Sequence, residues 1–140
     1  RKNKRKPERL HKMKTIIIMG STSDEPHAKK ITDKLDEYGI TWEQHAASAH
    51  KQPLKVLEIL EANKNEKNIV YITIAGRSNA LSGFVAANSE FPTIGCPPFS
   101  DKSDMLVNIH STLQMPSQTP VLTVIDPGNC ALAVKRIFGV

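Results

Sequence analysis

Residues 69–75 are the part of this chain that most restricts its fold. The stretch reads Ile-Val-Tyr-Ile-Thr-Ile-Ala and is nearly continuous in apolar and β-branched character. An alternating pattern would indicate a strand with one face in water, whereas an unbroken apolar run of this length is typical of a strand covered on both faces. Such strands belong to parallel sheets with helices on either side. The sequence therefore predicts an α/β domain built around this strand.

Strand-like and helix-like stretches alternate along the rest of the chain. Further strands are expected at residues 15–19, 40–46, 91–96 and 120–125. Helices are expected at residues 26–38, from 54 until the polar stretch 63–68, and at 80–88, 104–114 and 130–138. The side chains of Met19, Met105 and Met115 are expected to pack in the core. Five strand–helix units with short connections predict a single doubly wound, flavodoxin-like domain with a parallel five-stranded core sheet. At 140 residues the chain is long enough for one such domain and too short for two.

The net charge of +5 comes from the N-terminus. Residues 1–14 hold eight basic side chains and one acidic one, which leaves 11 of the 19 basic and 13 of the 14 acidic side chains, a net charge of −2, for residues 15–140. We therefore expect residues 1–14 to be a flexible basic arm, a linker or an artificial extension, and residues 15–140 to be the domain. A nucleic-acid-binding arm stays open as an alternative, but the domain itself is not predicted to bind nucleic acid.

Composition excludes several other classes of protein. No apolar run approaches the roughly 20 residues that span a bilayer, and the N-terminus has no apolar signal core, so no membrane association is expected. Cys96 and Cys130 are isolated, which gives no support for a metal site or a disulfide framework. Reduced thiols and a cytoplasmic setting are expected.

Three polar loops each follow a predicted strand and precede a predicted helix. They are Gly20-Ser21-Thr22-Ser23-Asp24, Ser48-Ala49-His50-Lys51 and Gly76-Arg77-Ser78-Asn79. Parallel strands bring such loops to one edge of the sheet, where the ligands of open α/β sheets bind. The sequence therefore predicts one polar site formed by all three loops.

The first loop can present backbone N–H groups and the hydroxyls of Ser21 and Ser23 to a phosphate at a helix N-terminus. It matches neither the Walker loop nor G-x-G-x-x-G, so ATP and dinucleotides are not indicated. Asp24 would repel a phosphate and better suits sugar hydroxyls. The alternative is that Ser23 and Asp24 only cap the following helix.

The other two loops supply charge and a proton carrier. His50 can give or take a proton near neutral pH, Lys51 can attract an anion, and Arg77 can clamp a phosphate or carboxylate. Ser48, Ser78 and Asn79 add neutral hydrogen-bonding groups. The alternative is that His50 and Lys51 are ordinary surface residues. His27, His45 and His110 are weaker candidates for catalysis.

Taken in order, these motifs resemble the phosphoribosylaminoimidazole carboxylase (PurE) family. The resemblance covers residues 15–138 and also includes Leu113-Gln114-Met115-Pro116 and Asn129-Cys130-Ala131-Leu132-Ala133. It implies an enzyme of purine biosynthesis that acts on a ribonucleotide without ATP, biotin, metal or another cofactor. It also implies a homo-octamer with active sites between subunits.

The family has two classes, and two loops favour one of them. The class that rearranges N5-carboxyaminoimidazole ribonucleotide usually carries Ser-Ala-His-Arg and a Gly-Gly-Ala-Ala-His loop. This chain instead has Lys51 and Gly76-Arg77-Ser78-Asn79, which resemble the class that carboxylates aminoimidazole ribonucleotide directly with carbon dioxide. The resemblance implies that His50 is the proton shuttle and that the substrate-binding residues are Ser21, Ser23, Asp24, Ser48, Lys51, Arg77, Ser78 and Asn79. The mutase of the same family and a non-catalytic nucleotide-binding module remain as alternatives.

Overall fold

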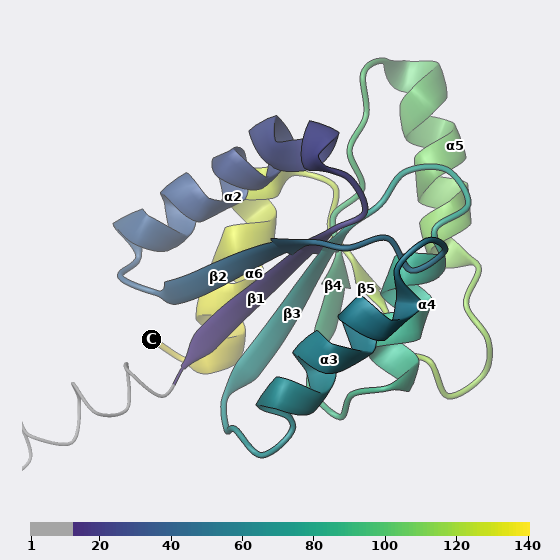
Figure 1. Cartoon of the computed structure of the whole chain (residues 1–140). Coiled ribbons are helices and arrows are strands. Elements are labelled where there is room, and N and C mark those ends of the chain that lie inside the picture. Colours follow the sequence, from purple (N-terminus) through teal and green to yellow (C-terminus); the bar gives the residue numbers. More distant parts are fainter. Residues whose placement is uncertain (1–12) are drawn as a thin grey trace, which may run out of the picture.

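The computed structural model describes residues 13–140, which form a five-stranded parallel sheet with helices on both faces (Figure 1). The spatial order of the strands is β2-β1-β3-β4-β5. This is the flavodoxin-like order, so the predicted fold class is confirmed. The strands are β1 (Lys14–Met19), β2 (Thr41–Ala46), β3 (Ile69–Ile74), β4 (Thr93–Gly95) and β5 (Leu122–Thr123).

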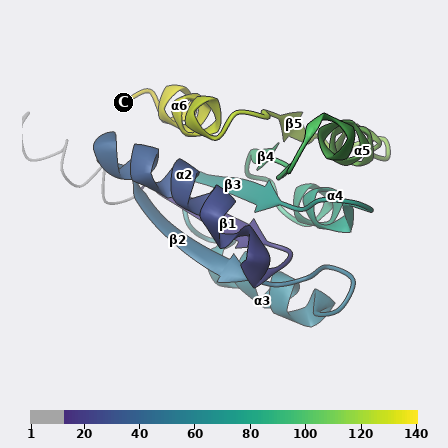
Figure 2. The same cartoon turned by 90° about the horizontal axis from the view of Figure 1, so that it is seen from above.

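The helices divide between the two faces of the sheet. α2 and α6 pack together on one face, and α3 and α4 cover the other (Figure 2). The short helix η1 precedes α2, and α5 stands beyond the carboxyl ends of the strands (Figure 1). The bounds are η1 (Thr22–Asp24), α2 (Glu25–Glu37), α3 (Pro53–Asn63), α4 (Ala80–Ala87), α5 (Lys102–Leu113) and α6 (Pro127–Phe138). No helix within residues 13–140 is long and apolar enough to cross a membrane.

β3 is buried along its whole length, as its apolar run predicts. Val70, Ile72 and Ile74 belong to the core under α2 and α6. Ile69 and Tyr71 belong to the second core, under α3 and α4. The strand therefore joins two hydrophobic layers, and its carboxyl end is held rigidly at the edge where the loops lie.

The first and last strands along the chain, β1 and β5, differ from the sequence-based expectation. β1 starts at Lys14, whose backbone N–H donates to the Asn68 carbonyl at 3.0 Å, and Met13 is already buried in the core. The remaining residues of the predicted arm, 1–12, lie outside the described residues. β5 has two residues rather than the six expected, since it is an edge strand and Pro120 has no N–H to donate.

α5 is a helix as predicted, but Met105, Ile109 and Leu113, which recur at a spacing of four residues, do not form its buried face. Its buried side chains are the polar Asn108 and Thr112, while Leu106, Val107 and Leu113 are exposed. Met105 and Met115 are only partly buried, so the prediction that they pack in the core is wrong. The reason is that the inner face of α5 contacts the polar 76–79 loop through Asn108 and Thr112, and Thr112 also lies against Gly95 of β4.

Candidate active site

The three predicted loops meet at the point where the chain changes the face of the sheet. β1 and β3 are neighbours, and β1 leads into α2 on one face while β3 leads into α4 on the other (Figure 1). The two connections diverge and leave a crevice beyond the strand ends, which is where open α/β sheets bind ligands. The loop after β2 closes one side of this crevice.

A hollow of about 210 Å³ occupies the crevice. Six of the nine predicted site residues line it, namely Ser21, Asp24, Ser48, His50, Arg77 and Ser78. The structure therefore brings together residues that are up to 57 positions apart in the chain. The side chains of Ser23, Lys51 and Asn79 do not line the hollow.

In the first loop Ser21 rather than Asp24 supplies the helix cap. The Ser21 hydroxyl oxygen accepts from the Ser23 backbone N–H at 3.2 Å and lies 2.9 Å from the Ser23 hydroxyl. Asp24 makes no capping hydrogen bond through its side chain, so the alternative that it only caps the helix is not what the structure shows. Burial raises the pKa of the Asp24 carboxyl, and the nearby His27 partly opposes that rise.

His50 is held by the main chain of a different loop. Its Nε2 lies 2.9 Å from the carbonyl oxygen of Ser78. A carbonyl oxygen can only accept, so Nε2 carries the proton and Nδ1 is the basic nitrogen of the neutral ring. In the same turn the Ser48 hydroxyl accepts from the Lys51 N–H at 3.2 Å. The Lys51 side chain itself is exposed to solvent outside the hollow.

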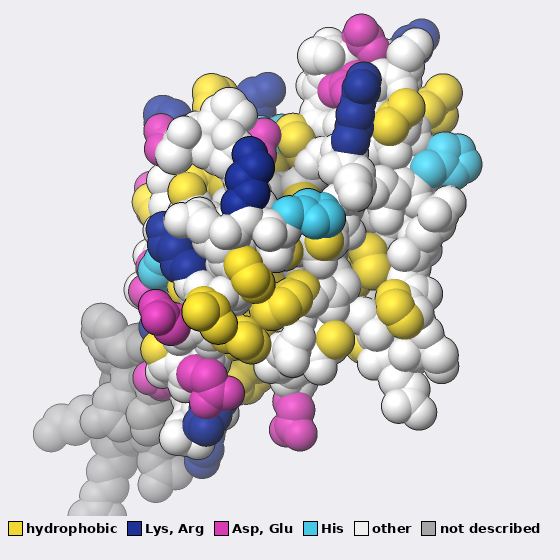
Figure 3. All heavy atoms as spheres, turned by 45° about the vertical axis from the view of Figure 1, so that its right-hand side comes forward, with side chains coloured by type: hydrophobic (Ala, Val, Ile, Leu, Met, Phe, Trp, Pro, Cys, Tyr) yellow, Lys and Arg dark blue, Asp and Glu magenta, His cyan; other side chains and the backbone are white. Residues whose placement is uncertain are grey.

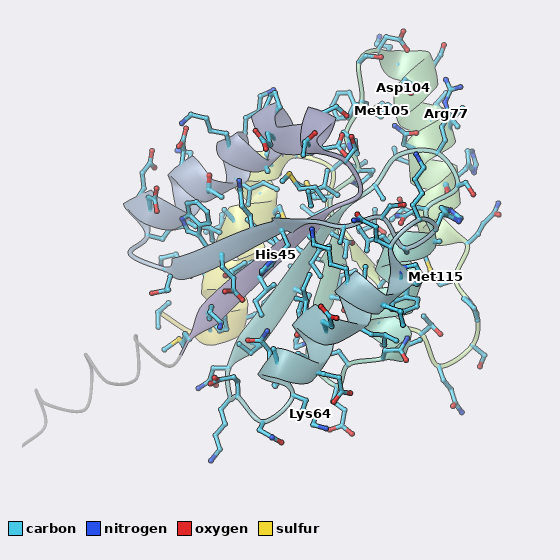
Figure 4. The ribbon with its side chains drawn as sticks, viewed as in Figure 1. His45, Lys64, Arg77, Asp104, Met105 and Met115 are labelled. Atoms are coloured by element: carbon cyan, nitrogen blue, oxygen red, sulfur yellow. The ribbon has the colours of Figure 1, made fainter. Side chains whose placement is uncertain are left out.

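Each residue of the 76–79 loop is used differently. Arg77 is exposed, and its Nη2 lies 3.8 Å from the Asp104 carboxylate on α5 (Figure 4). Ser78 lines the hollow with a φ of 52°, in the left-handed region. Asn79 turns inward and caps α4, because its side-chain oxygen accepts from the Ser82 N–H at 3.0 Å.

The other histidines within residues 13–140, namely His27, His45 and His110, do not line the hollow. His27 contacts the end of β4 instead, with its Nε2 3.2 Å from the Cys96 carbonyl oxygen and 3.5 Å from the Cys96 sulfur. A hydrogen bond with Cys130 and the contact with His27 lower the pKa of the Cys96 thiol to about 6. His45 lies on β2, away from Arg77 and the hollow (Figure 4). Among residues 13–140 no three His, Cys, Asp or Glu side chains are grouped to hold a metal ion.

Fold and site together define a flavodoxin-like α/β enzyme domain, with a histidine, a carboxylate, an arginine and hydroxyls gathered at the strand switch point. The profile of the AIR carboxylase family matches residues 14–140, and the chain belongs to that family. It is accordingly a carboxy-lyase of the group that serves purine biosynthesis, as the sequence motifs indicated.

Individual relatives agree with this assignment. The chain is 50% identical over 126 residues to the phosphoribosylaminoimidazole carboxylase of Archaeoglobus fulgidus, covering 90% of this chain and 69% of the relative. It is 35% identical over 127 residues to a human bifunctional carboxylase and succinocarboxamide synthetase, covering 90% of this chain but 30% of that protein. The crystal structure of Treponema denticola PurE superposes with a TM-score of 0.83 at 43% identity, over 90% of this chain and 80% of that one.

Proposed function

We propose that this enzyme carboxylates 5-aminoimidazole ribonucleotide with carbon dioxide, without ATP, to give 4-carboxy-5-aminoimidazole ribonucleotide. The observation that carries the proposal is the position of His50 at the hollow, with Nε2 held by Ser78 and Nδ1 left as a base. The 76–79 loop that holds it has the Gly-Arg-Ser-Asn sequence that resembles the carbon-dioxide-dependent class.

The chemistry needs little beyond positioning and one base. The aminoimidazole ring is enamine-like, so its C4 is already nucleophilic, and holding it against carbon dioxide supplies the proximity effect. A bond forms between C4 and the carbon of carbon dioxide, and one C=O electron pair moves onto oxygen to give a carboxylate. The proton on C4 then passes to Nδ1 of His50, and the C–H electron pair restores the aromatic ring.

The other residues are assigned by charge. Asp24, whose side chain makes no capping hydrogen bond, accepts hydrogen bonds from the ribose hydroxyls. Arg77 and the hydroxyls of Ser21, Ser48 and Ser78 surround the phosphate and the new carboxylate. Lys51 attracts the anionic substrate from the rim. Ser23 supports Ser21 through their hydrogen bond. Asn79 is buried beneath the loop and supports its conformation rather than contacting the substrate.

Substrate choice tests the proposal. A spectrophotometric assay offers aminoimidazole ribonucleotide with bicarbonate-buffered carbon dioxide and no ATP, beside the N5-carboxy isomer alone. Turnover of the first substrate only is expected. Turnover of the isomer only would make the enzyme the mutase of the same family and reject the interpretation of the 76–79 loop.

A variant of His50 separates catalysis from binding. His50→Asn should abolish turnover while the protein still binds the ribonucleotide, since the proton carrier is lost and the hollow is kept. Binding without turnover in both the wild type and the variant would favour a non-catalytic nucleotide-binding module. Near-normal turnover in His50→Asn would reject His50 as the shuttle.

A homo-octamer in the cytoplasm completes the proposal. Leu106, Val107 and Leu113 expose apolar surface on α5, and hydrophobic side chains are visible over that part of the molecule in Figure 3. A second copy of the chain packed on α5 would remove this surface from water. The cytoplasmic setting rests on the sequence, in which Cys96 and Cys130 are isolated and form no disulfide pattern.

A further inference from the structure

We infer that Asn79 is a positioning residue for His50, acting through the conformation of Ser78. The inference rests on the proposed function, in which His50 carries the proton. The sequence predicts Asn79 as a substrate-binding residue, yet its side chain is buried and does not line the hollow. Its role in the site therefore has to be exerted through its neighbours.

The Asn79 side chain is tied to two other elements. Its Nδ2 donates to the Ser82 hydroxyl at 2.8 Å and to the Thr112 hydroxyl at 2.9 Å. Its backbone N–H donates to the Ser111 hydroxyl at 2.5 Å. Asn79 is thus fixed both to α4 and to the inner face of α5.

The network continues to the sheet. The Ser82 hydroxyl lies 2.7 Å from that of Thr73 on β3, and the Thr112 hydroxyl donates to the Asn108 carbonyl at 2.9 Å. All of these side chains are buried. Buried polar networks whose members are paired hold one geometry, because any departure leaves a donor or acceptor without a partner. Asn79 is therefore one of the most firmly placed residues beside the hollow.

Ser78 needs such an anchor. Its φ of 52° is unfavourable for a residue with a side chain. The fixed Asn79 follows it, and the Ala80 N–H donates to the Ser78 carbonyl at 2.8 Å. In this conformation the same carbonyl oxygen also accepts from Nε2 of His50 at 2.9 Å, which uses both of its lone pairs.

The position of the Ser78 carbonyl determines the tautomer of His50. While the Ser78 carbonyl is held in place, the proton of the neutral ring stays on Nε2, and Nδ1 is left as the base. If Ser78 relaxed to an ordinary backbone conformation, its carbonyl would turn away and the ring would lose both its orientation and its tautomer preference. The two functions of the loop, shaping the hollow and setting the base, therefore depend on the buried amide of Asn79.

Nitrogen-15 NMR of the histidine side chains in the full chain tests the inference, with the His50 resonances assigned by their absence in His50→Asn. We expect the wild type to show His50 protonated at Nε2 when neutral. Asn79→Asp keeps an acceptor for the Ser82 N–H but loses both amide donations, so His50 should become a mixture of tautomers. The kcat of the Asn79→Asp enzyme should fall by about tenfold or more, with little change in KM.

Asn63→Asp is the matched control. Asn63 is also buried, and its Nδ2 donates to the Ile59 carbonyl at 2.8 Å at the far end of α3. This variant also loses a buried amide donor, so it should share any loss of stability but leave the tautomer and kcat at their wild-type values. An unchanged His50 tautomer in a folded Asn79→Asp protein would overturn the inference.

A second pair of variants decides the case if Asn79→Asp does not fold. Ser78 is exposed, so substitution there spares the core. Ser78→Gly favours a positive φ and keeps the carbonyl, and should preserve the Nε2 tautomer. Ser78→Val disfavours a positive φ, so His50 should lose its preference for the Nε2 tautomer in that variant. The same tautomer in both variants would overturn the inference.

The tautomer measurement and the turnover measurement test the inference and the proposed function separately. A changed tautomer with unchanged carboxylation would mean that Asn79 positions His50 but that His50 is not the shuttle, which rejects the proposed mechanism. A loss of turnover with an unchanged tautomer would reject the inference and leave the proposed function intact.

Discussion

The guanidinium of Arg77 and the carboxylate of Asp104 lie 3.8 Å apart, and this pair joins the loop after β3 to the first turn of α5 (Figure 4). The Arg77 side chain is 74% exposed, and exposed pairs of this kind contribute about 0–1 kcal/mol to stability. Asp104 also accepts from the Ser100 N–H at 3.0 Å, so its carboxylate is held on α5 whatever Arg77 does. Arg77 is therefore free to turn toward an anion in the hollow that it lines.

Replacing Arg77 should affect ligand binding rather than folding. We expect Arg77→Ala to raise KM for the ribonucleotide by about tenfold or more, since a hydrogen bond to a charged group contributes about 1.5–3 kcal/mol. The free energy of unfolding should change by less than about 0.5 kcal/mol. Steady-state kinetics and denaturant titration measure the two effects. Arg136→Ala, at an exposed position on α6, is the control and should change neither; an unaltered KM in Arg77→Ala would remove Arg77 from the binding site.

The loops of the site could be predicted from sequence because each follows a recognisable strand. The apolar run of β3 and the β-branched residues of β1 indicate buried parallel strands, and parallel strands place their following loops at one edge. Ser21, Asp24, His50 and Arg77 line the same hollow for this reason. The positions of these residues follow from topology alone, without knowledge of their side-chain partners.

The orientation of Asn79 and the inner face of α5 could not be predicted in this way. Asn79 turns inward because Ser111 and Thr112, more than thirty residues later, supply its partners. Helical spacing on α5 shows which residues share a face but not which face is covered. Asn108 is buried against the polar loop at Gly76, Thr112 is buried against Asn79 and Gly95 of β4, and Leu113 is exposed as a result.

The charged carboxylate of Asp24 is expected to lower the stability of the folded protein at pH 7 while it contributes to substrate binding. Burial raises the pKa of its carboxyl above the ordinary value, so the folded state disfavours the charged form. Its contribution to stability is therefore present at low pH and is lost as pH rises through the folded-state pKa. Asp24→Asn should melt at a higher temperature than the wild type at pH 7, and the difference should disappear toward pH 3 while substrate binding weakens.

Thermal melts over this pH range, with binding measured at pH 7, check the prediction. Asp33→Asn on α2 is the control, because Asp33 is exposed and pairs with Lys29 at 2.9 Å. That substitution should give no stabilisation, since such i,i+4 pairs contribute about 0.3–0.5 kcal/mol. A lower melting temperature in Asp24→Asn would show that the carboxylate is satisfied in the folded protein.

Tyr71 carries a buried hydroxyl that has no hydrogen-bond partner among the described residues. Burial, with a smaller contribution from Glu43, raises the pKa of Tyr71 to about 12. Because an unpaired buried polar group costs about 1–3 kcal/mol, Tyr71→Phe should raise the free energy of unfolding by about 1 kcal/mol. The wild type should lose stability as pH rises from about 10 to about 12, since tyrosine in the unfolded chain ionises first.

Denaturant titration at pH 8 and at alkaline pH measures both effects. Tyr71→Phe should be less sensitive to alkaline pH than the wild type. Tyr38→Phe is the control at a partly buried position beside Lys135, and it should keep the wild-type alkaline response. A loss of more than about 1 kcal/mol in Tyr71→Phe would mean that the hydroxyl forms a stabilising hydrogen bond.

Assembly through α5 should depend on Leu113, whose side chain is 60% exposed. Burying a leucine against another subunit contributes about 1.5–3 kcal/mol, and an octamer would repeat that contribution in every copy. Leu113→Glu places an unpaired charge there, so the chain should keep its fold but lose its assembled state in sedimentation analysis. Asn65→Glu adds the same charge at an exposed position after α3 and should assemble normally. If Leu113→Glu sediments like the wild type, the apolar face of α5 is not the contact between copies, and its exposed leucines require a different partner.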